Sequence, residues 1–415
     1  MTDYNHGAAP VPPQNPVAPA LAVTPATAES RPALGGAGGA KGMAARDFSM
    51  AIALVVIWAF FAYATRLNFV SARNLSNLAV ELSITAVLAL GALLIIVAGQ
   101  IDLSIGSGVG LFGGVAAVLI TLYHWPASTA MLLAAAMAII VWLLMGTLIV
   151  TQRIPAFIIT LAGLLVFCGL HWKVINSVTI PVAVGGQSNL LSTLTTWYLP
   201  PHWGWGLATL VCVLIGYGLW NTRRRRQEFG FTLEPAAVAI SKFLILSQLV
   251  AIFVVVCNQY RGIPLSALIL AVTALIMAVL TKQTRFGRYL YAIGSNEEAA
   301  LVSGVPVRKT VITAFGIMGF IVALGGFMQT AYAGASTTTI GELLELDAIA
   351  ACVIGGTSLR GGRGTVLGVI FGALIMASLV NGMTLMALPP ETKYIARGSV
   401  LALAVWLDMR LSRNA

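Results

Sequence analysis

The apolar stretches of the chain constrain its fold more than any other feature, because they recur at short intervals from residue 48 almost to the C-terminal end. A helix needs about 20 mainly apolar residues to cross a hydrocarbon core of about 30 Å. The segments that approach this requirement are 48–64, 77–98, 104–122, 129–150, 155–171, 205–220, 242–258, 264–281, 310–332, 345–358, 365–387 and 394–409. Several are short, above all 345–358. The sequence therefore predicts an all-α, polytopic membrane protein of about 10–12 transmembrane helices, with 345–358 as a candidate re-entrant segment.

Composition agrees with a lipid surrounding and excludes other classes of protein. The chain is 58% hydrophobic and only 9% charged, whereas charged residues make up about a quarter of a soluble domain. The net charge of +10 comes from short basic clusters between apolar stretches rather than from one patch, which argues against nucleic-acid binding. The cysteines and histidines are scattered without metal or redox spacing, so we expect neither a metal site nor a disulfide framework.

The first 45 residues differ from the rest of the chain. They are rich in Pro, Ala and Gly and have no apolar period, which predicts a disordered cytoplasmic tail over residues 1–45. The apolar run that begins near Phe48 lacks the basic region and cleavage site of a secretory signal, so we expect a retained first span. Residues 46–415 are then one transmembrane domain.

Basic residues predict the orientation of the chain, because Lys and Arg gather in cytoplasmic loops. The densest clusters are 223–226, 282–309 and the pair Arg410 and Arg413, and all three lie on one side if both termini are cytoplasmic. Three arginines fall on the other side, namely Arg66, Arg73 and Arg261. The segment 172–203, rich in Ser, Thr and aromatic residues, then becomes the longest outside loop.

Two segments carry glycines spaced four residues apart, a spacing that lets helices approach closely in lipid. These glycines are Gly106, Gly110 and Gly114, followed by Gly364, Gly368 and Gly372. We expect them to form packing seams. Their occurrence in the two halves of the chain hints at an internal repeat, although no residue-level self-similarity supports it.

The polar segment 285–309 is long enough to leave the membrane between two spans, and it contains its own helix signals. Ser295 can cap a short helix with Glu298 reaching back three residues later, and Gly304 followed by Pro306 stops it. Since isolated helices below about 12 residues are marginal in water, a partner must hold this one. It is either a rigid knob that fits a groove on another protein or a capped surface loop that contacts only headgroups.

Three blocks in this order resemble the permeases of ATP-binding-cassette importers for ribose and xylose. The blocks are "QIDLSIGSGVGLFGGVAA" from Gln100, "GRYLYAIGSNEEAALVSGVPV" from Gly287 and "ELDAIAACVIGGTSLRGGRGT" from Glu345. Further segments look most like those of xylose permeases: "SARNLSNL" at Ser71, "IPAFIITLAG" at Ile154, "NQYRGIP" at Asn258, "NGMTLMALP" at Asn381 and "LALAVWLDM" at Leu401. The similarity covers roughly residues 48–410. An extra basic loop and pair of spans around 205–258 makes the chain xylose-like rather than ribose-like.

The resemblance implies that 46–415 is a permease domain and that 285–309 is its coupling loop, which docks in a cleft of a cytoplasmic ATPase. The coupling residues implied by position are Gly294, Asn296, Glu297, Glu298, Ala299, Ala300 and Gly304. No G-x-x-x-x-G-K-[ST] sequence occurs, so we expect no cofactor in this chain and no ATPase site of its own. ATP and Mg²⁺ would bind the partner ATPase. The other implied partners are a periplasmic or extracellular sugar-binding protein and a second permease copy, in the lipid of a bacterial inner membrane.

Candidates for the substrate path are polar residues at interruptions of the apolar segments and aromatic residues suited to the C–H face of a sugar. They are Asp102, Ser104, Phe157, Thr160, Asn176, Asp347 and Asn381. Ser104 is expected to cap the helix that follows it. For Asp102 the alternative is a structural role, as a helix cap or as the partner of an arginine on a neighbouring helix. Asp347 either orders the candidate re-entrant segment or contacts substrate.

The expected function is import of a monosaccharide, with xylose as the resemblance-based choice, although the sequence does not distinguish it from other monosaccharides. One alternative is a secondary transporter in which Asp102 and Glu345 are proton or ion sites. Another is an ATP-driven exporter permease for a hydrophobic signal. Dependence of uptake on an ATPase and on an external binding protein separates these three functions.

Overall fold

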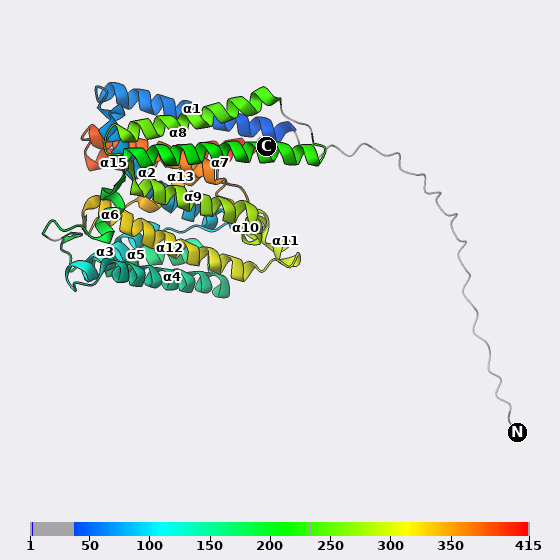
Figure 1. Cartoon of the computed structure of the whole chain (residues 1–415). Coiled ribbons are helices and arrows are strands. Elements are labelled where there is room, and N and C mark those ends of the chain that lie inside the picture. Colours follow the sequence, from blue (N-terminus) through cyan, green and yellow to red (C-terminus); the bar gives the residue numbers. More distant parts are fainter. Residues whose placement is uncertain (1, 3–36, 184, 232–234, 414–415) are drawn as a thin grey trace.

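Helices dominate the computed structural model, which describes residue 2 and residues 37–183, 185–231 and 235–413 (Figure 1). Each predicted apolar segment overlaps an α-helix. The helices are α1 (Ala37–Ala64), α2 (Ala72–Val97), α3 (Ile105–Thr121), α4 (Ala127–Gln152), α5 (Ala156–Val174), α6 (Leu190–Thr196), α7 (Pro201–Glu228), α8 (Ala236–Asn258), α9 (Leu265–Gln283), α10 (Arg285–Ser295), α11 (Glu297–Val302), α12 (Val307–Ala333), α13 (Leu344–Ile354), α14 (Val366–Leu385) and α15 (Pro390–Arg413), with a 3₁₀ turn, η1, at Asn68–Val70. Among the described residues, 8 helices are long and apolar enough to cross a membrane by themselves. The protein is therefore an all-α, multi-pass membrane protein.

The N-terminal helix begins earlier than the apolar pattern indicates. α1 starts at Ala37, inside the segment expected to be a tail. Residues 1 and 3–36, which make up most of that segment, lie outside the described residues. The boundary at residue 45 therefore stays a prediction.

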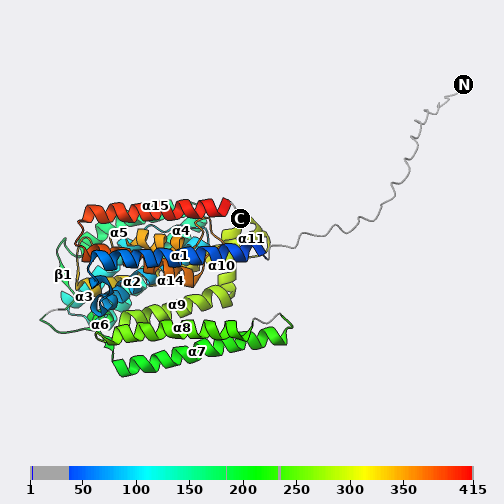
Figure 2. The ribbon, with the colours of Figure 1, turned by 90° about the horizontal axis from the view of Figure 1, so that it is seen from above.

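Two long helices, α2 and α12, form the centre of the bundle. In α2, 89% of the most apolar window is buried, and in α12, 72%. α12 packs against α2, α3 and α4, while α2 also contacts α9, α13 and α14. By contrast, α7 and α8 form a hairpin at one edge of the bundle (Figure 2), and only 11% of the apolar window of each is buried. Their apolar surface faces outward, as expected for helices in contact with lipid.

The glycine seams pack as predicted. A Cβ atom on Gly110 would lie 2.7 Å from the carbonyl oxygen of Ile340, and one on Gly114 would lie 2.9 Å from the ring of His171. Gly368 and Gly372 meet the backbone of α13 and of the loop that follows it. Only a glycine lets these backbones come so close, so the seams hold α3 against the 340–345 segment and α14 against α13.

Short strands join the connections at one end of the bundle, opposite α10 and α11 (Figure 2). β1 (Ile180–Pro181) pairs with β4 (Ala335–Ser336), and β2 (Tyr198–Leu199) pairs with β3 (Ile263–Pro264), both antiparallel. The Trp172 indole donates a hydrogen bond to the Thr338 carbonyl oxygen at 3.1 Å. The predicted outside loop 172–203 is therefore joined to the connection 334–343. We call this the strand end, and the other the α11 end.

The segment around α13 crosses the bundle instead of re-entering it. β4 lies at the strand end, whereas Gly362, which follows α13, donates a backbone hydrogen bond to Val97 near the α11 end at 2.9 Å. At 11 residues, α13 is about 17 Å long, too short to cross alone. The chain covers the remaining depth in the non-helical segment 337–343, whose backbone packs on the glycines of α3. The re-entrant interpretation is thus wrong, because the succession of turns over 337–343 supplies the rest of the span.

Candidate functional site: a buried polar break and an exposed helix joined at the α11 end

A polar break separates α2 from α3 inside the bundle, and Asp102 lies at its centre. The Asp102 side chain is buried at 2% exposure. Its Oδ1 accepts hydrogen bonds from the Ser104 amide at 2.8 Å and hydroxyl at 2.6 Å, and its Oδ2 accepts one from the Trp142 indole Nε1 at 2.7 Å. The chain thus satisfies both carboxylate oxygens without an arginine. This arrangement orders the break between the two helices, as buried polar groups require.

Ser104 has a different role from the one expected. It occupies the residue before α3, but its side chain makes no capping hydrogen bond to that helix. Its hydroxyl donates to Asp102 instead. The expectation of a serine cap is wrong because Ser104 has helical backbone angles instead of the extended ones of a capping residue, and its side chain is directed to Asp102.

Thr160 ties α5 to the same break. Its hydroxyl lies 3.2 Å from the carbonyl oxygen of Ile101 and 3.0 Å from that of Ala156, within hydrogen-bond distance of both. Three predicted path residues, Asp102, Ser104 and Thr160, therefore meet around one interruption of the helical backbone.

The other predicted path residues lie elsewhere in the structure. Asn381 on α14 is buried and accepts a hydrogen bond at 2.8 Å from Asn74 on α2. Phe157 is 50% exposed on the outside of α5, and Asn176 is an exposed residue with φ of 51° in the turn after that helix. Phe157 and Asn176 thus occupy the surface and a turn, away from the break.

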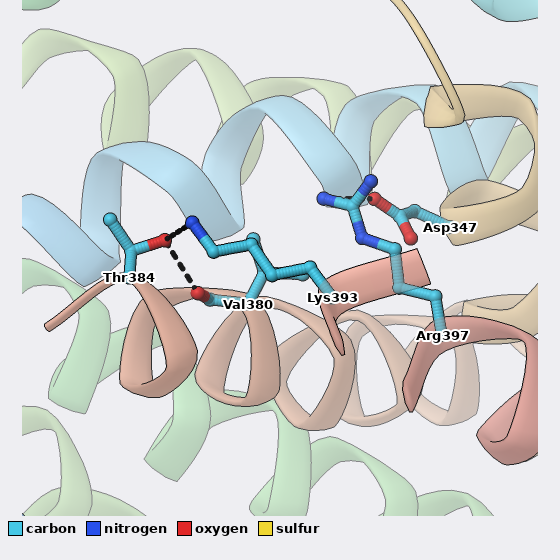
Figure 3. A network of polar contacts seen from close by, with 5 residues as sticks. All are labelled: Asp347, Val380, Thr384, Lys393 and Arg397. Atoms are coloured by element: carbon cyan, nitrogen blue, oxygen red, sulfur yellow. Dashed lines mark hydrogen bonds and ion pairs between the residues drawn. The ribbon is translucent and has the colours of Figure 1, made fainter. Parts of the chain in front are cut away.

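Asp347 on α13 pairs with α15 (Figure 3). Its Oδ2 lies 3.4 Å from the guanidinium of Arg397, and both side chains are largely buried. Lys393, also on α15, donates a hydrogen bond at 3.2 Å to the hydroxyl of Thr384 on α14. That hydroxyl donates to the Val380 carbonyl oxygen at 2.8 Å. The contact favours the first of the two roles predicted for Asp347, that of ordering α13, because α13 is held to α15 by a buried ion pair.

The predicted coupling loop forms two helices at the α11 end (Figure 1). Asn296 caps α11, since its side chain accepts from the Ala299 amide at 2.9 Å, while Ser295 ends α10 and donates to the Tyr291 carbonyl oxygen. The capping signal is therefore displaced by one residue from Ser295. Gly304 stops the helix at φ of 79°, as predicted. The left-handed conformation suits glycine, which has no Cβ to clash.

α11 has an exposed face and one buried residue, Ala300. Glu297, Glu298 and Ala299 are exposed, whereas Ala300 is buried at 5% exposure against the core. The amide of Val305 donates to the Ala300 carbonyl oxygen at 3.0 Å and closes the turn after the helix. The buried Ala300 and the capping contacts at both ends therefore hold this six-residue helix in place.

Backbones from three parts of the chain meet directly beneath this helix, in a contact that we call the glycine junction (Val97, Gly294, Gly361 and Gly362). A Cβ atom on Gly294 would overlap the Val97 carbonyl oxygen and lie 2.5 Å from the Gly362 amide nitrogen. Gly361 lies against Gly294 with φ of 88°. α10 is thus fastened to the last turn of α2, five residues before Asp102.

Tyr291 supports the glycine junction from the side. Its hydroxyl donates to the Gly364 carbonyl oxygen at 2.7 Å. Burial raises the pKa of the Tyr291 hydroxyl, which keeps it protonated and able to donate. The α10 helix therefore holds the loop between α13 and α14 by one side-chain bond in addition to the glycine contacts.

Two residues of the site, Trp142 and Tyr291, were not among the predicted ones. Trp142 is fully buried in α4, where the residues from 130 to 146 are otherwise Ala, Gly, Ile, Leu, Met and Val. A buried indole needs an acceptor for its N–H, so a lone tryptophan in such a helix is a signal that could have been paired with the buried carboxylate of Asp102. Tyr291 offers no comparable signal, because its acceptor is a backbone carbonyl.

The bundle, the polar break and the two exposed helices of the predicted coupling loop are features of a multi-pass membrane protein. The family model for the permease component of the branched-chain amino acid transport system matches residues 74–405. The chain belongs to this permease family.

Several relatives match over most of the chain. The xylose transport system permease protein XylH of Escherichia coli K12 is 38% identical over 92% of this chain and 97% of its own length. The protein of the same name from Haemophilus influenzae is 40% identical over 87% of this chain and 95% of its own length. The ribose import permease protein RbsC of Escherichia coli K12 is 30% identical over 82% of this chain and 87% of its own length. No solved structure matches the chain significantly.

Proposed function

We propose that the chain is the permease subunit of an ATP-binding-cassette importer and that it carries a monosaccharide, xylose first among them, into the cytoplasm. Its support is the match over nearly the whole length to relatives named xylose transport permeases, with weaker similarity to a ribose import permease. ATP is hydrolysed on separate ATPase subunits that hold the nucleotide and Mg²⁺. This chain supplies the path through the membrane.

The observation that carries the proposal is the attachment of the exposed helix α11 to the polar break. Glu297 and Glu298 project from a capped helix, and the glycine junction fastens the preceding helix to α2. A rigid link transmits a displacement, whereas a mobile loop would absorb it. A push on α11 by an ATPase therefore reaches the backbone just before Asp102.

The distribution of charge supports a cytoplasmic α11 end. Arg223–Arg226 end α7 at this end of the bundle, and Arg285 and Arg288 lie on α10. The first turns of α1 and the last turns of α15 lie there as well (Figure 2). Both termini of the membrane domain are then cytoplasmic, in keeping with the preference of basic residues for that side.

The strand end is then the outer face, where a sugar-binding protein docks. The paired strands β1 and β4 join the two connections expected to receive it, 172–203 and 334–343. Such an importer uses two copies of the permease around one path, with lipid around the pair. The tethered loops give the binding protein a defined surface.

The test is a charge reversal on the coupling helix. Glu297→Lys with Glu298→Lys should leave the protein inserted but reduce ATP-driven sugar uptake about tenfold or more, a loss of at least about 1.4 kcal/mol of coupling. The measurement is uptake into proteoliposomes that contain permease, ATPase subunits and loaded binding protein. Glu228→Lys, an exposed acid at the same end on α7, is the matched control and should transport normally.

Two results would overturn the proposal. One is wild-type uptake in the double variant. The other is uptake that needs no ATP and collapses with the proton gradient, which would instead support an ion-coupled transporter.

A further inference from the structure

A polar pocket of about 430 Å³ opens at the strand end, far from the glycine junction. It lies where α1 ends, η1 turns and α2 begins, and the end of α14 closes one side. The lining residues are Ala64, Thr65, Asn68, Ser71, Arg73, Asn74, Asn77, Leu385 and Met386. Its volume falls in the range of about 300–1,000 Å³ that small-molecule sites occupy.

The floor of the pocket is rigid. Asn74 is buried, and its side-chain amide donates to the Phe69 carbonyl oxygen and to the Asn381 side chain, both at 2.8 Å. Ser71 caps α2 by accepting from the Asn74 amide at 3.3 Å, and its hydroxyl donates to the Asn68 carbonyl oxygen at 2.7 Å. The pocket is therefore preformed, and a ligand would lose little affinity to its ordering.

Three other lining residues offer hydrogen-bonding groups that the described part of the chain does not use. The side chains of Asn68, Arg73 and Asn77 make no hydrogen bond or ion pair with another described residue. An amide side chain both donates and accepts, and a guanidinium donates only. Leu385 and Met386 add apolar surface to the lining.

These groups match the chemistry of a neutral polyhydroxylated molecule. Each sugar hydroxyl donates and accepts, so it can use both ends of an amide, and an apolar wall can take the C–H face of a sugar ring. Among the described residues that line the pocket there is no carboxylate, and Arg73 is the only cation. An acidic side chain of a docking protein would use the donors but leave the amide oxygens of Asn68 and Asn77 without partners.

We propose that this pocket is a monosaccharide site on the outer face of the permease, where sugar released from the binding protein is held before it enters the membrane. This site rests on the proposed function and adds to it a place where the sugar binds on the permease. It also gives Asn381 a part in substrate handling, since this residue fixes the orientation of Asn74 in the floor.

The first measurement is saturation-transfer NMR with D-xylose on the full-length permease in nanodiscs. The wild-type protein should transfer saturation to the sugar. Asn68→Ala and Asn77→Ala should each reduce the transfer strongly, because each removes a donor and an acceptor without filling the pocket. Gln187→Ala, an exposed amide on the connection after β1 at the same end, is the matched control and should leave the transfer unchanged.

The second measurement is uptake by the complete complex. Asn77→Ala should reduce xylose uptake several-fold while ATPase activity without sugar and assembly with the ATPase stay at the wild-type level. Equal saturation transfer in the wild type and both asparagine variants, or wild-type uptake by Asn77→Ala, would overturn the site and leave the proposed function standing. Absence of sugar uptake by the wild-type complex would instead overturn the function.

Arg73→Ala separates the sugar from a protein ligand. A variant that binds the sugar-loaded binding protein more weakly, while saturation transfer to xylose is unchanged, would identify the pocket as a docking site for an acidic side chain and overturn the proposal. Weaker saturation transfer with unchanged affinity for the binding protein supports it.

Discussion

The glycine junction and the α7–α8 hairpin both contain glycines, yet two of the glycines on α7 lie in entirely different surroundings from those of the junction. In the junction, Gly294, Gly361 and Gly362 touch the backbones of other segments. On α7, a Cβ atom added to Gly206 or Gly218 would find nothing within 4 Å. The same residue thus marks a mechanical contact in one region and a lipid-facing surface in the other.

The difference shows which helices of this permease can carry a displacement. α2 is buried over most of its length and is fastened at its last turn to α10. α7 contacts mainly α8, and its 28 residues extend about 42 Å, enough to carry its basic end beyond a hydrocarbon core of about 30 Å. Changes in the first region should alter transport, whereas changes in the second should alter little.

The largest effect on transport is expected from Gly294→Ala. The new methyl group would overlap the Val97 carbonyl oxygen, and backbone cannot move aside as a flexible side chain can. Overpacking of this kind costs typically about 1–3 kcal/mol, and we expect the upper end of that range. Uptake by the reconstituted complex should fall strongly, and the unfolding temperature of the detergent-solubilised protein should drop.

Gly218→Ala on α7 is the matched control, because it adds the same methyl group to a helix in open space. Alanine is the better helix former by about 1 kcal/mol in exposed positions, so this variant should be as stable as the wild type or slightly more so. Equal transport by both variants would show that the junction is not a mechanical contact.

The two regions also differ in how far the sequence predicts them. The lipid-facing hairpin follows from apolar length and a terminal run of arginines, which are local properties. The glycine junction joins residues up to 265 positions apart in the chain, Val97 and Gly362, and nothing near Val97 indicates which loop will meet it. Gly294 in addition resembles a helix boundary in the sequence, although α10 continues through it to Ser295.

A second effect is expected at the polar break. Asp102→Ala leaves the Trp142 indole and the Ser104 amide buried without their acceptor, and an unsatisfied buried donor costs about 1–3 kcal/mol. The unfolding temperature should fall. The loss of transport should be accompanied by a lower anisotropy of tryptophan fluorescence. Thr209→Ala on α7, whose hydroxyl bonds only to its own helix, is the control.

Asp102→Asn distinguishes the structural role from an ion-binding one. The introduced side-chain amide keeps one oxygen that can accept from the donors that Asp102 satisfies, so the unfolding temperature should recover in part. A variant as stable as the wild type that has lost only proton-dependent uptake would contradict the structural assignment and favour an ion site.

Like the lipid-facing hairpin, the candidate site was predictable only where local properties of the sequence mark its residues. Asp102 and Thr160 stand out as polar residues within or beside apolar runs, and the structure brings them together. Phe157 and Asn176 satisfy similar local criteria but lie at the surface. Residue type and spacing give the depth of a side chain along its helix, whereas the direction in which it points depends on the neighbouring helices.

The smallest effect is expected from Tyr291→Phe, which removes one hydroxyl from the side of the glycine junction. The lost hydrogen bond to the Gly364 carbonyl oxygen is worth about 1 kcal/mol, and the ring and the glycine contacts remain. Assembly with the ATPase should persist, while the amount of sugar moved per ATP hydrolysed should fall. Tyr289→Phe, two residues earlier on the same helix, is the matched control because its hydroxyl has no partner among the described residues. An unchanged ratio of sugar to ATP in Tyr291→Phe would show that the glycine backbones transmit the movement without help from side chains. The contrast with the hairpin would then rest on backbone contact alone.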